Sequence, residues 1–559
     1  MMRSAPLGFI LLTLVFAQTS RAGLLDQFRS WQSHITSEAA VKAFESKKMA
    51  EAAVAARRAI QLDRNNKQAI DILAKLSAAV SPDNEVRWRQ RLVELEPGSS
   101  DAVMDLVQAA IDARQVETGA KALAKIPEND RHLRFYRLAA GLSLVAGDQR
   151  QAAELYRQAT TEKGAENADR FNVAALDLGA ADSVRSVAAE KALTSLSSDP
   201  ALTVKCHRLL ASHFITINDF ESARPHIDYL LGVDKVDFQD VIMALDFFSS
   251  VDRAKFDQLL ANCFVRFQNE ALPASQIVRW LNAKGFLAEA KTSPGKVTPG
   301  VANDPVFRAA YADTLTDLKD WNALQEWTTG HDWGPDEYLR IAYQLRARRE
   351  LNKIMLSEFQ IGWDQALARA QQQAEYLSVL HSLATVWGWD AEAEKALWAG
   401  ANGQTHQMEA LQALWKMYQQ KKNTRGLFRV ASRMLELRSG DKVIKNNVVM
   451  LGSLLGIDNN LFREWAKQNW EEDHGAHPEF ATTYAYVLFQ RGKTDDAVAV
   501  LGKMNADALN KPSDALYAGI IRATTGDQED AKRLFDIASG GDLLPEEQQL
   551  LSQNRSKVQ

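Results

Sequence analysis

The sequence has few of the residues that cross-link, break or anchor a fold. Only two of its 559 residues are cysteines, which excludes a disulfide-rich domain. The 14 prolines and 29 glycines are few for this length, so most of the chain is free to form helix. The net charge of −5 leaves no basic excess, and we expect no nucleic-acid partner. The densest basic cluster, RARR at 346–349, is followed by Glu350 and is interpreted as a solvated helix face.

The two cysteines, Cys206 and Cys263, lie far apart in segments that both have helical character. They form either one disulfide or two buried free thiols. Free thiols are favoured because cysteine packs as a small hydrophobic residue. The CxxC spacing of a metal or redox site is missing, so we expect neither.

Long hydrophobic runs are also scarce. The longest, LGFILLTLVFA at 7–17, has 11 residues, whereas a bilayer span needs about 20. A positive residue precedes it and a polar stretch ending in a small residue follows, which is the layout of a secretory signal peptide. We predict cleavage after Ala22, with Ala17 as the alternative. The mature chain is therefore expected to be exported, soluble and without a transmembrane segment, in the periplasm or outside the cell.

Catalytic motifs are missing as well. HExxH, GxSxG and a complete glycine-rich phosphate loop do not occur, and the GKT at 492–494 lacks the first glycine of such a loop. His474 and His477 have no acidic or thiol partner at the spacing of a metal site. We therefore predict no catalytic residue, cofactor or metal ion, and no enzymatic activity.

What is abundant is a recurring spacing of small and large residues. Three stretches share it: LVAGDQRQAAELYRQA, LFQRGKTDDAVAVLGKM and ATTGDQEDAKRLFDIA. Each has a glycine, a small residue five positions on, a large one at nine, and a small or medium one at twelve. In that order they are Gly147, Ala152, Tyr156 and Ala159; Gly492, Ala497, Leu501 and Met504; and Gly526, Ala531, Phe535 and Ala538. The glycine permits a tight turn and the small residues let two helix axes approach.

This spacing, with 34 residues between Gly492 and Gly526, resembles the tetratricopeptide repeat. Weaker copies surround Lys47, Ala181, Asn218 and Lys422. The resemblance implies an all-α, right-handed superhelical solenoid of antiparallel helix hairpins. Between about 235 and 400 the frame drifts, and this part is either degenerate hairpins of the same solenoid or a distinct helical insert.

Proline and glycine are concentrated in one internal stretch, KTSPGKVTPGVANDP at 291–305. Such a density stops helices, so we predict a linker or an extended loop there. The expected organisation is a signal peptide at 1–22, one array at 23–290, the linker at 291–305 and a second array at 306–559.

Tryptophans are unevenly distributed, with 11 of the 13 between Trp280 and Trp470. They either pack in the helical core, which we favour for most of them, or line a groove for peptide or glycan. Trp333 and Trp363 are flanked by Gly and Asp, and we predict that they are the exposed aromatic contacts.

The position nine residues before the turn is a more specific indication of peptide binding than the tryptophans are. In tetratricopeptide domains that hold an extended peptide, it often faces the groove and is often asparagine. Here it is Asn172 and Asn447, and elsewhere Leu138, Leu209, Ala413, Thr483 and Tyr517. An asparagine amide both donates and accepts, which suits a peptide backbone, although it serves equally to tie neighbouring hairpins together.

Two classes of function remain open. The first is an exported, non-catalytic scaffold or adaptor that binds a protein or peptide in the concave groove, in envelope assembly or secretion. The second is a helical superhelix associated with glycan or cell-wall processing, similar to the lytic transglycosylases. The second class needs a compact catalytic domain, whereas this chain ends in two of its clearest repeats.

Overall fold

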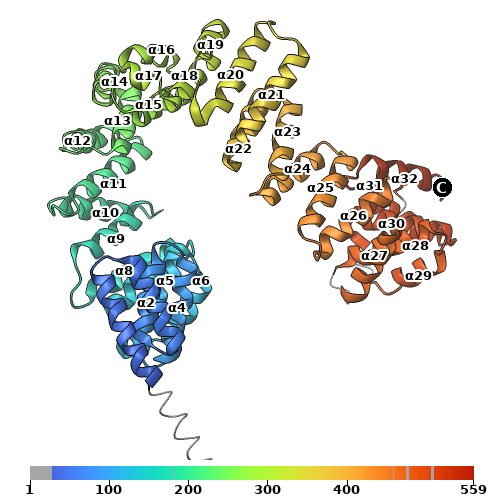
Figure 1. Ribbon diagram of the computed structural model, residues 1–559, viewed down its shortest axis with the longest axis horizontal. Coiled ribbons are helices and arrows are strands. Elements are labelled where there is room, and N and C mark those ends of the chain that lie inside the picture. The colour runs from blue at the N-terminus through green and yellow to red at the C-terminus, as the bar shows by residue number, and fades with distance from the viewer. Residues whose placement is uncertain are drawn as a thin grey trace, which may run out of the picture. The chain divides into compact units, whose positions relative to one another are not determined.

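The computed structural model describes residues 28–558 except 181, 331, 458, 474–476 and 505–508. The predicted signal peptide and both of its cleavage sites lie outside the described residues. No strand occurs in this described part of the chain, and successive helices form antiparallel hairpins in sequence order (Figure 1). The predicted all-α array of helix hairpins is confirmed.

The chain divides into two compact units, Met1–Leu260 and Ala261–Gln559. In unit 1, residues 28–45 are helical, and they are followed by the helices listed next. These are α2 (Met49–Leu62), α3 (Lys67–Ala78), α4 (Pro82–Leu95), α5 (Ser100–Asp112), α6 (Val116–Leu123), η1 (Glu128–Asp130), α7 (Leu133–Val145), α8 (Gln149–Thr161), α9 (Asn167–Leu178), α10 (Ser183–Leu196), α11 (Thr203–Thr216), α12 (Phe220–Leu231) and α13 (Phe238–Val251). The division falls within α14 (Arg253–Phe267).

Unit 2 continues the hairpins to the C-terminal region. Its helices are α15 (Ala271–Ala283), α16 (Leu287–Lys291), η2 (Ser293–Lys296), α17 (Pro299–Ala302), α18 (Pro305–Asp317), α19 (Trp321–Trp327), η3 (Gly334–Asp336), α20 (Glu337–Glu350), α21 (Leu356–Ala370), α22 (Ala374–Val386), α23 (Asp390–Ala401), α24 (Gln407–Gln420), α25 (Thr424–Leu437), α26 (Lys442–Leu454), α27 (Asn460–Asp473), α28 (Pro478–Gln490), α29 (Thr494–Leu501), α30 (Pro512–Thr524), α31 (Gln528–Ser539) and α32 (Pro545–Arg555).

The hairpin turns keep the repeat frame through the region where the sequence pattern fades. Gly147, Gly492 and Gly526 have φ values of 84°, 74° and 85°, which a turn of this type requires. Between 235 and 400 the same left-handed turn residue recurs, 34, 33 and 36 residues apart. It is Gly285, Lys319, Asn352 and Gly388. From Gly285 to Gly388 the described residues therefore keep the hairpin frame, as expected for degenerate hairpins of the same solenoid.

Small residues lie where the two helices of a hairpin approach. Ala152, Ala497 and Ala531 are fully buried, as are Ala159 and Ala538. The large residue at the ninth position fills the space beside them, with Phe535 fully buried and Tyr156 half-buried. The spacing read from the sequence thus marks the contacts within each hairpin.

Buried acids connect the first helices of neighbouring hairpins. Each acid is the third residue of its helix, where the helix dipole favours negative charge, and it bonds to a side chain 32 residues earlier. The pairs are Arg137 with Asp169, Arg208 with Asp240, and Thr482 with Asp514. Arg137 bonds both carboxylate oxygens of Asp169 at 2.7 Å. First helices also contact one another directly, as α28 contacts α30.

The segment 291–305 differs from the predicted linker. It forms the short helices η2 and α17, and Ser293 and Val301 are buried against unit 2. Pro294 and Pro299 are the second and first residues of the short helices η2 and α17, and Pro305 is the first residue of α18. These positions need no backbone N–H, so the prolines start helices here. The division between compact units lies at 260/261, whereas the sequence predicted a boundary at 290 and a linker or loop at 291–305.

Both cysteines are free and buried, as the sequence favoured. Burial raises the pKa of the Cys263 thiol to about 12, so the thiolate is suppressed at neutral pH. Cys206 is fully buried in unit 1, and burial raises its pKa as well. Each thiol acts as core packing.

Candidate functional site

A groove of about 550 Å³ lies on the first helices of the last hairpins in unit 2. Its walls come from α24, α26, α28 and α30, which are adjacent in Figure 1, and from the chain that leads into α32. Trp415, Asn446, Asn447 and Met450 line one side. We call this hollow the asparagine groove.

The groove gathers one position of the repeat from three successive hairpins. Asn447, Thr483 and Tyr517 each precede the turn glycine by nine residues, and all three line it. Residues 34 to 36 apart in sequence meet in this way only if the hairpins stack in a common frame. The described residues therefore form an array of helix hairpins whose spacing resembles that of the tetratricopeptide repeat. Asn447 lines this groove, and its role in peptide binding stays a prediction.

The asparagine groove contains an unsatisfied acceptor that the sequence reading missed. Asn446 is only 5% exposed, and its Oδ1 is buried with no hydrogen-bond partner in the described structure. Such an orphan costs free energy unless a ligand supplies a donor. Asn447 is half-exposed and makes no hydrogen bond to another described residue. The repeat position identifies only Asn447, and the neighbouring Asn446 is visible in the sequence as the first residue of an Asn-Asn pair.

The charged groups of the groove, in contrast, have partners. Tyr517 donates a hydrogen bond of 2.6 Å to Glu547, and Thr482 donates one of 2.5 Å to Asp514. Burial raises the pKa of Tyr517 well above its ordinary value, and burial also raises the pKa of Asp514. Lys511 pairs with the carboxylate of Glu479 at 3.3 Å. The charged groups are thus already paired, whereas the side-chain amides of Asn446 and Asn447 retain hydrogen-bonding capacity.

The end of the chain closes one side of the groove. Thr424, at the start of α25, donates a hydrogen bond to Glu546, and Lys422 forms an ion pair with Asp542. These contacts join segments about 120 residues apart, and the segment 542–547 borders the groove as a result. No local sequence pattern indicates this return of the chain.

Asn172 has a different setting. It lies on α9 in unit 1, whereas Asn447 lies in unit 2, so the two belong to separate units. Asn172 is half-buried, and its side chain bonds to no other described residue. The role of Asn172 in peptide binding stays a prediction.

Trp333 and Trp363 are not the exposed contacts that we predicted. Both side chains are completely buried, and neither indole N–H has a hydrogen-bond partner within the described residues. Trp363 lies inside α21 and packs against Trp389, with ring centroids 5.9 Å apart. Its neighbour Gly362 marks a close helix contact, because a Cβ there would lie 2.7 Å from Leu345. The flanking glycine was misread as a loop signal.

The basic cluster at 346–349 is also less solvated than expected. The guanidinium of Arg346 lies 5.3 to 5.7 Å from the ring centroids of Trp321, Trp387 and Trp389. Burial lowers the pKa of Arg346, and Glu350 pairs with it at 2.9 Å. Several tryptophans of this region therefore enclose a cation and form core, as favoured for most of them.

Among the described residues, three or more His, Cys, Asp or Glu side chains nowhere gather in a way that could hold a metal ion. Within the same residues, every helix is too short or too polar to cross a bilayer.

No family model and no curated protein sequence matches the chain. Solved structures resemble it only distantly. Among them, the MamA protein has 17% identity over 31% of this chain and 94% of its own, with a TM-score of 0.27. Naa15/Naa10 bound to HypK-THB has 12% identity over 94% of this chain and 92% of its own, with a TM-score of 0.36. PilF of Pseudomonas aeruginosa has 11% identity over 47% of this chain and 99% of its own, with a TM-score of 0.27. We draw no functional conclusion from these likenesses.

Proposed function

We propose that this chain is an exported, non-catalytic scaffold that binds an extended segment of a protein partner in the asparagine groove. The observation that supports this most is the buried, unpartnered Oδ1 of Asn446 beside the free amide of Asn447. Export rests on the N-terminal sequence pattern alone.

An extended peptide fits this chemistry. Its backbone offers an N–H and a C=O at every residue, so a single segment supplies a donor to Asn446 and both groups to Asn447. Trp415 and Met450 add apolar surface to the same wall, which favours a side chain of the peptide. A groove of this kind binds by shape and hydrogen bonding and needs no catalytic group.

The test compares variants for their affinity to a partner recovered with the mature chain as bait. Asn447→Ala should weaken binding by roughly 1–3 kcal/mol, because one partner group loses its hydrogen bond. Asn172→Ala removes the same amide at the same repeat position in unit 1, and it tests whether that asparagine also contributes to binding, as the sequence predicts. Unchanged binding of Asn447→Ala together with a lowered melting temperature would show that the amide ties hairpins together.

A second variant separates binding from folding more sharply. Asn446→Leu replaces an unsatisfied buried amide by an apolar group of similar size. We expect unchanged or higher thermal stability, because an orphan acceptor costs about 1–3 kcal/mol, but loss of partner binding. A zymogram on cell-wall glycan with the same protein tests the alternative class of function.

A further inference from the structure

A second hollow, in unit 1, has a different chemical character. It has a volume of about 830 Å³ and lies among α2, α3 and α4. Four arginines line it, and no acidic side chain does. We call it the basic hollow and define it by Arg57, Arg64, Arg87 and Arg91, with Trp88.

The basic hollow is formed by two sequence stretches with the same helical spacing. Both place lining residues at positions i, i+3, i+4 and i+7, which share one face of a helix, except that Arg64 lies in the turn after α2. The two sets are Arg57, Ile60, Gln61 and Arg64, and Asn84, Arg87, Trp88 and Arg91. Leu73 and Ser77 of α3 lie between them. The result is an apolar floor with guanidinium groups around it.

Three of these arginines lack a counter-charge. Arg91 donates hydrogen bonds to Glu94 at 2.6 Å and to Asn65 at 2.7 Å. Arg57, Arg64 and Arg87 make neither an ion pair nor a hydrogen bond with any described residue. In a chain whose net charge is −5, unpaired guanidinium groups around one hollow are a local excess of positive charge.

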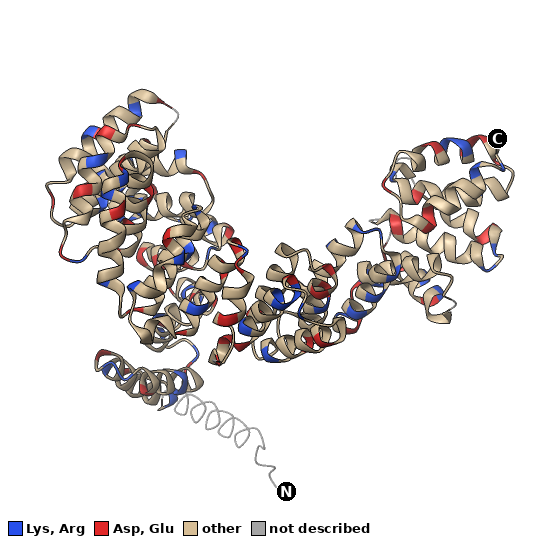
Figure 2. Ribbon diagram, turned by 90° about the horizontal axis from the view of Figure 1, so that it is seen from above, with Lys and Arg blue, Asp and Glu red and all other residues tan. Residues whose placement is uncertain are grey.

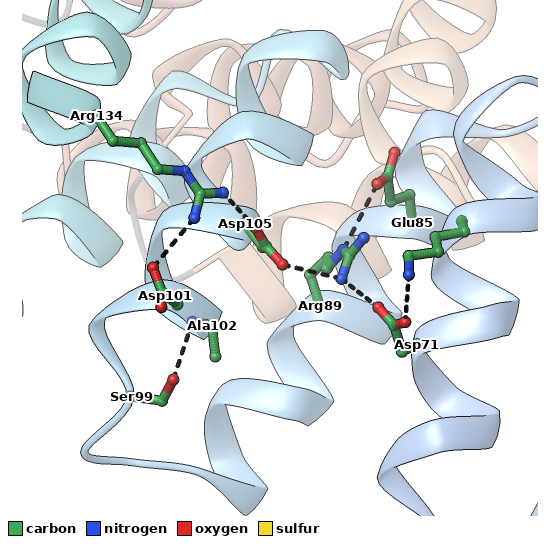
Figure 3. Close-up of polar contacts among 9 residues, drawn as sticks. Asp71, Glu85, Arg89, Ser99, Asp101, Ala102, Asp105 and Arg134 are labelled. Atoms are coloured by element: carbon green, nitrogen blue, oxygen red, sulfur yellow. Dashed lines mark hydrogen bonds and ion pairs between the residues drawn. The ribbon is translucent and has the colours of Figure 1, made fainter. Parts of the chain in front are cut away.

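The acids of this region are held elsewhere. Arg89 is two positions from Arg87 and so points to another face of α4, where it bonds Asp71 at 2.8 Å and Asp105 at 3.2 Å (Figure 3). Glu85 lies 3.6 Å from the same guanidinium. The network continues through Arg134, Asp101 and Lys75. Figure 2 shows both charge signs dispersed along the helices, whereas no acidic side chain lines the basic hollow.

We propose that the basic hollow binds an acidic segment of a polypeptide, in which carboxylates flank an apolar side chain. Carboxylates accept paired hydrogen bonds from guanidinium groups, whose planar fork matches their geometry. Trp88, Ile60 and Leu73 provide the apolar surface for the central side chain. A phosphate polymer uses only the arginines and leaves the apolar surface of Trp88, Ile60 and Leu73 without a contact.

Fluorescence anisotropy with the mature chain and a short labelled peptide, in which glutamates flank leucine, tests this proposal. We expect binding that weakens as salt is raised, and its loss when glutamine replaces glutamate. Arg87→Ala and Arg57→Ala should each weaken binding about tenfold or more, because each removes a charge-assisted hydrogen bond.

Arg58→Ala is the matched control, since Arg58 is exposed on the same helix and does not line the basic hollow. It should bind like the unaltered protein. Arg87→Glu should bind the glutamate peptide more weakly than Arg87→Ala does, and Arg87→Lys should keep most of the binding, a dependence on charge that unfolding would not produce. The proposal is overturned if the glutamine peptide binds equally, if Arg58→Ala matches Arg87→Ala, or if only polyphosphate or single-stranded nucleic acid binds.

Discussion

Two neighbouring asparagines show how much a single residue's surroundings matter. Asn446 and Asn447 have the same chemistry, but one is buried with an orphan oxygen and the other is half-exposed. Substitution of Asn447 should therefore act on binding alone. Substitution of Asn446 by leucine should weaken binding but raise stability. The reason is that its Oδ1 is needed for binding, whereas the fold offers this atom no hydrogen-bond donor.

The tryptophans allow a first prediction at the residue scale. Trp363→Ala should lower the free energy of unfolding by about 3–5 kcal/mol, because it empties a fully buried aromatic site. Trp415→Ala, in the half-buried wall of the asparagine groove, should cost less stability and should weaken partner binding. Thermal unfolding and partner affinity of both variants check this, and a strong binding defect confined to Trp363→Ala would contradict it.

Equivalent acids should respond oppositely to pH. The hydrogen bond from Arg137 lowers the pKa of Asp169, so the ionised acid stabilises the fold above its unfolded pKa of about 3.9. That stability is lost only as pH falls through the lowered folded pKa. Burial raises the pKa of Asp514, so its stabilising contribution is complete below about pH 3.9 and is lost as pH rises through the raised folded pKa.

Asparagine variants measure this second prediction. Asp169→Asn should cost about 1–2 kcal/mol at pH 7 and at pH 4 alike, a modest value because Arg137 is partly solvated. Asp514→Asn should be more stable relative to the unaltered protein at pH 7 than at pH 4, since it removes a buried ionised acid. The melting temperatures of both variants and of the unaltered protein at pH 7 and pH 4 test this prediction. If the effect of each substitution changed with pH in the same way, the opposite pKa shifts of Asp169 and Asp514 would be refuted.

At the scale of the element, the hairpin turn is the recurring constraint. Lys319 occupies the left-handed turn with φ of 55°, a conformation that costs a side-chain-bearing residue about 1–2 kcal/mol. We therefore expect Lys319→Gly to raise the melting temperature. Gly285→Ala is the reverse control, because a Cβ there meets no atom within 4 Å and only the backbone is strained. Equal effects of the two changes would exclude the backbone explanation.

The short helices at 291–305 show what composition alone misjudges. Their prolines and glycines resemble a linker in sequence, but the segment packs against α15 and α18. Lys291 forms an ion pair of 2.9 Å with Asp320, which also lowers the pKa of that acid. The prolines in this segment mark the starts of helices. Composition does not show whether such a segment packs against its neighbours or forms a linker.

For the whole molecule, the contact pattern predicts local stability. Helices contact mainly their neighbours in sequence, as in other repeat arrays. The destabilisation caused by a core substitution should therefore be confined to the adjacent hairpins. Phe535→Ala removes a fully buried ring beside Gly519 and should cost about 3–5 kcal/mol.

Hydrogen exchange resolves this last prediction. It should rise in α28 to α32 and stay unchanged in α7, which lies in the other compact unit. An equal rise in both places would show that the chain unfolds as one cooperative body. The contacts of Thr424 with Glu546 extend the expected effect back to α25.

The sequence by itself determined the helices, the turn positions and the small-to-large spacing within hairpins, and from these the position of Asn447. These features are local, because a turn and the helices beside it interact within about one repeat. Between 235 and 400 the turn signal was weak, since Lys319 and Asn352 stand where glycine is expected, although the backbone there is the same. The free cysteines followed from composition.

Tertiary structure alone decided which polar groups are left without partners. The orphan oxygen of Asn446 and the unpaired Arg57 and Arg87 depend on where every competing donor and acid lies. The burial of Trp363 and the return of the C-terminal segment to Thr424 likewise depend on packing between distant residues. Hydrogen bonding and burial are properties of the whole surroundings of a side chain, and these surroundings exist only once the hairpins have stacked.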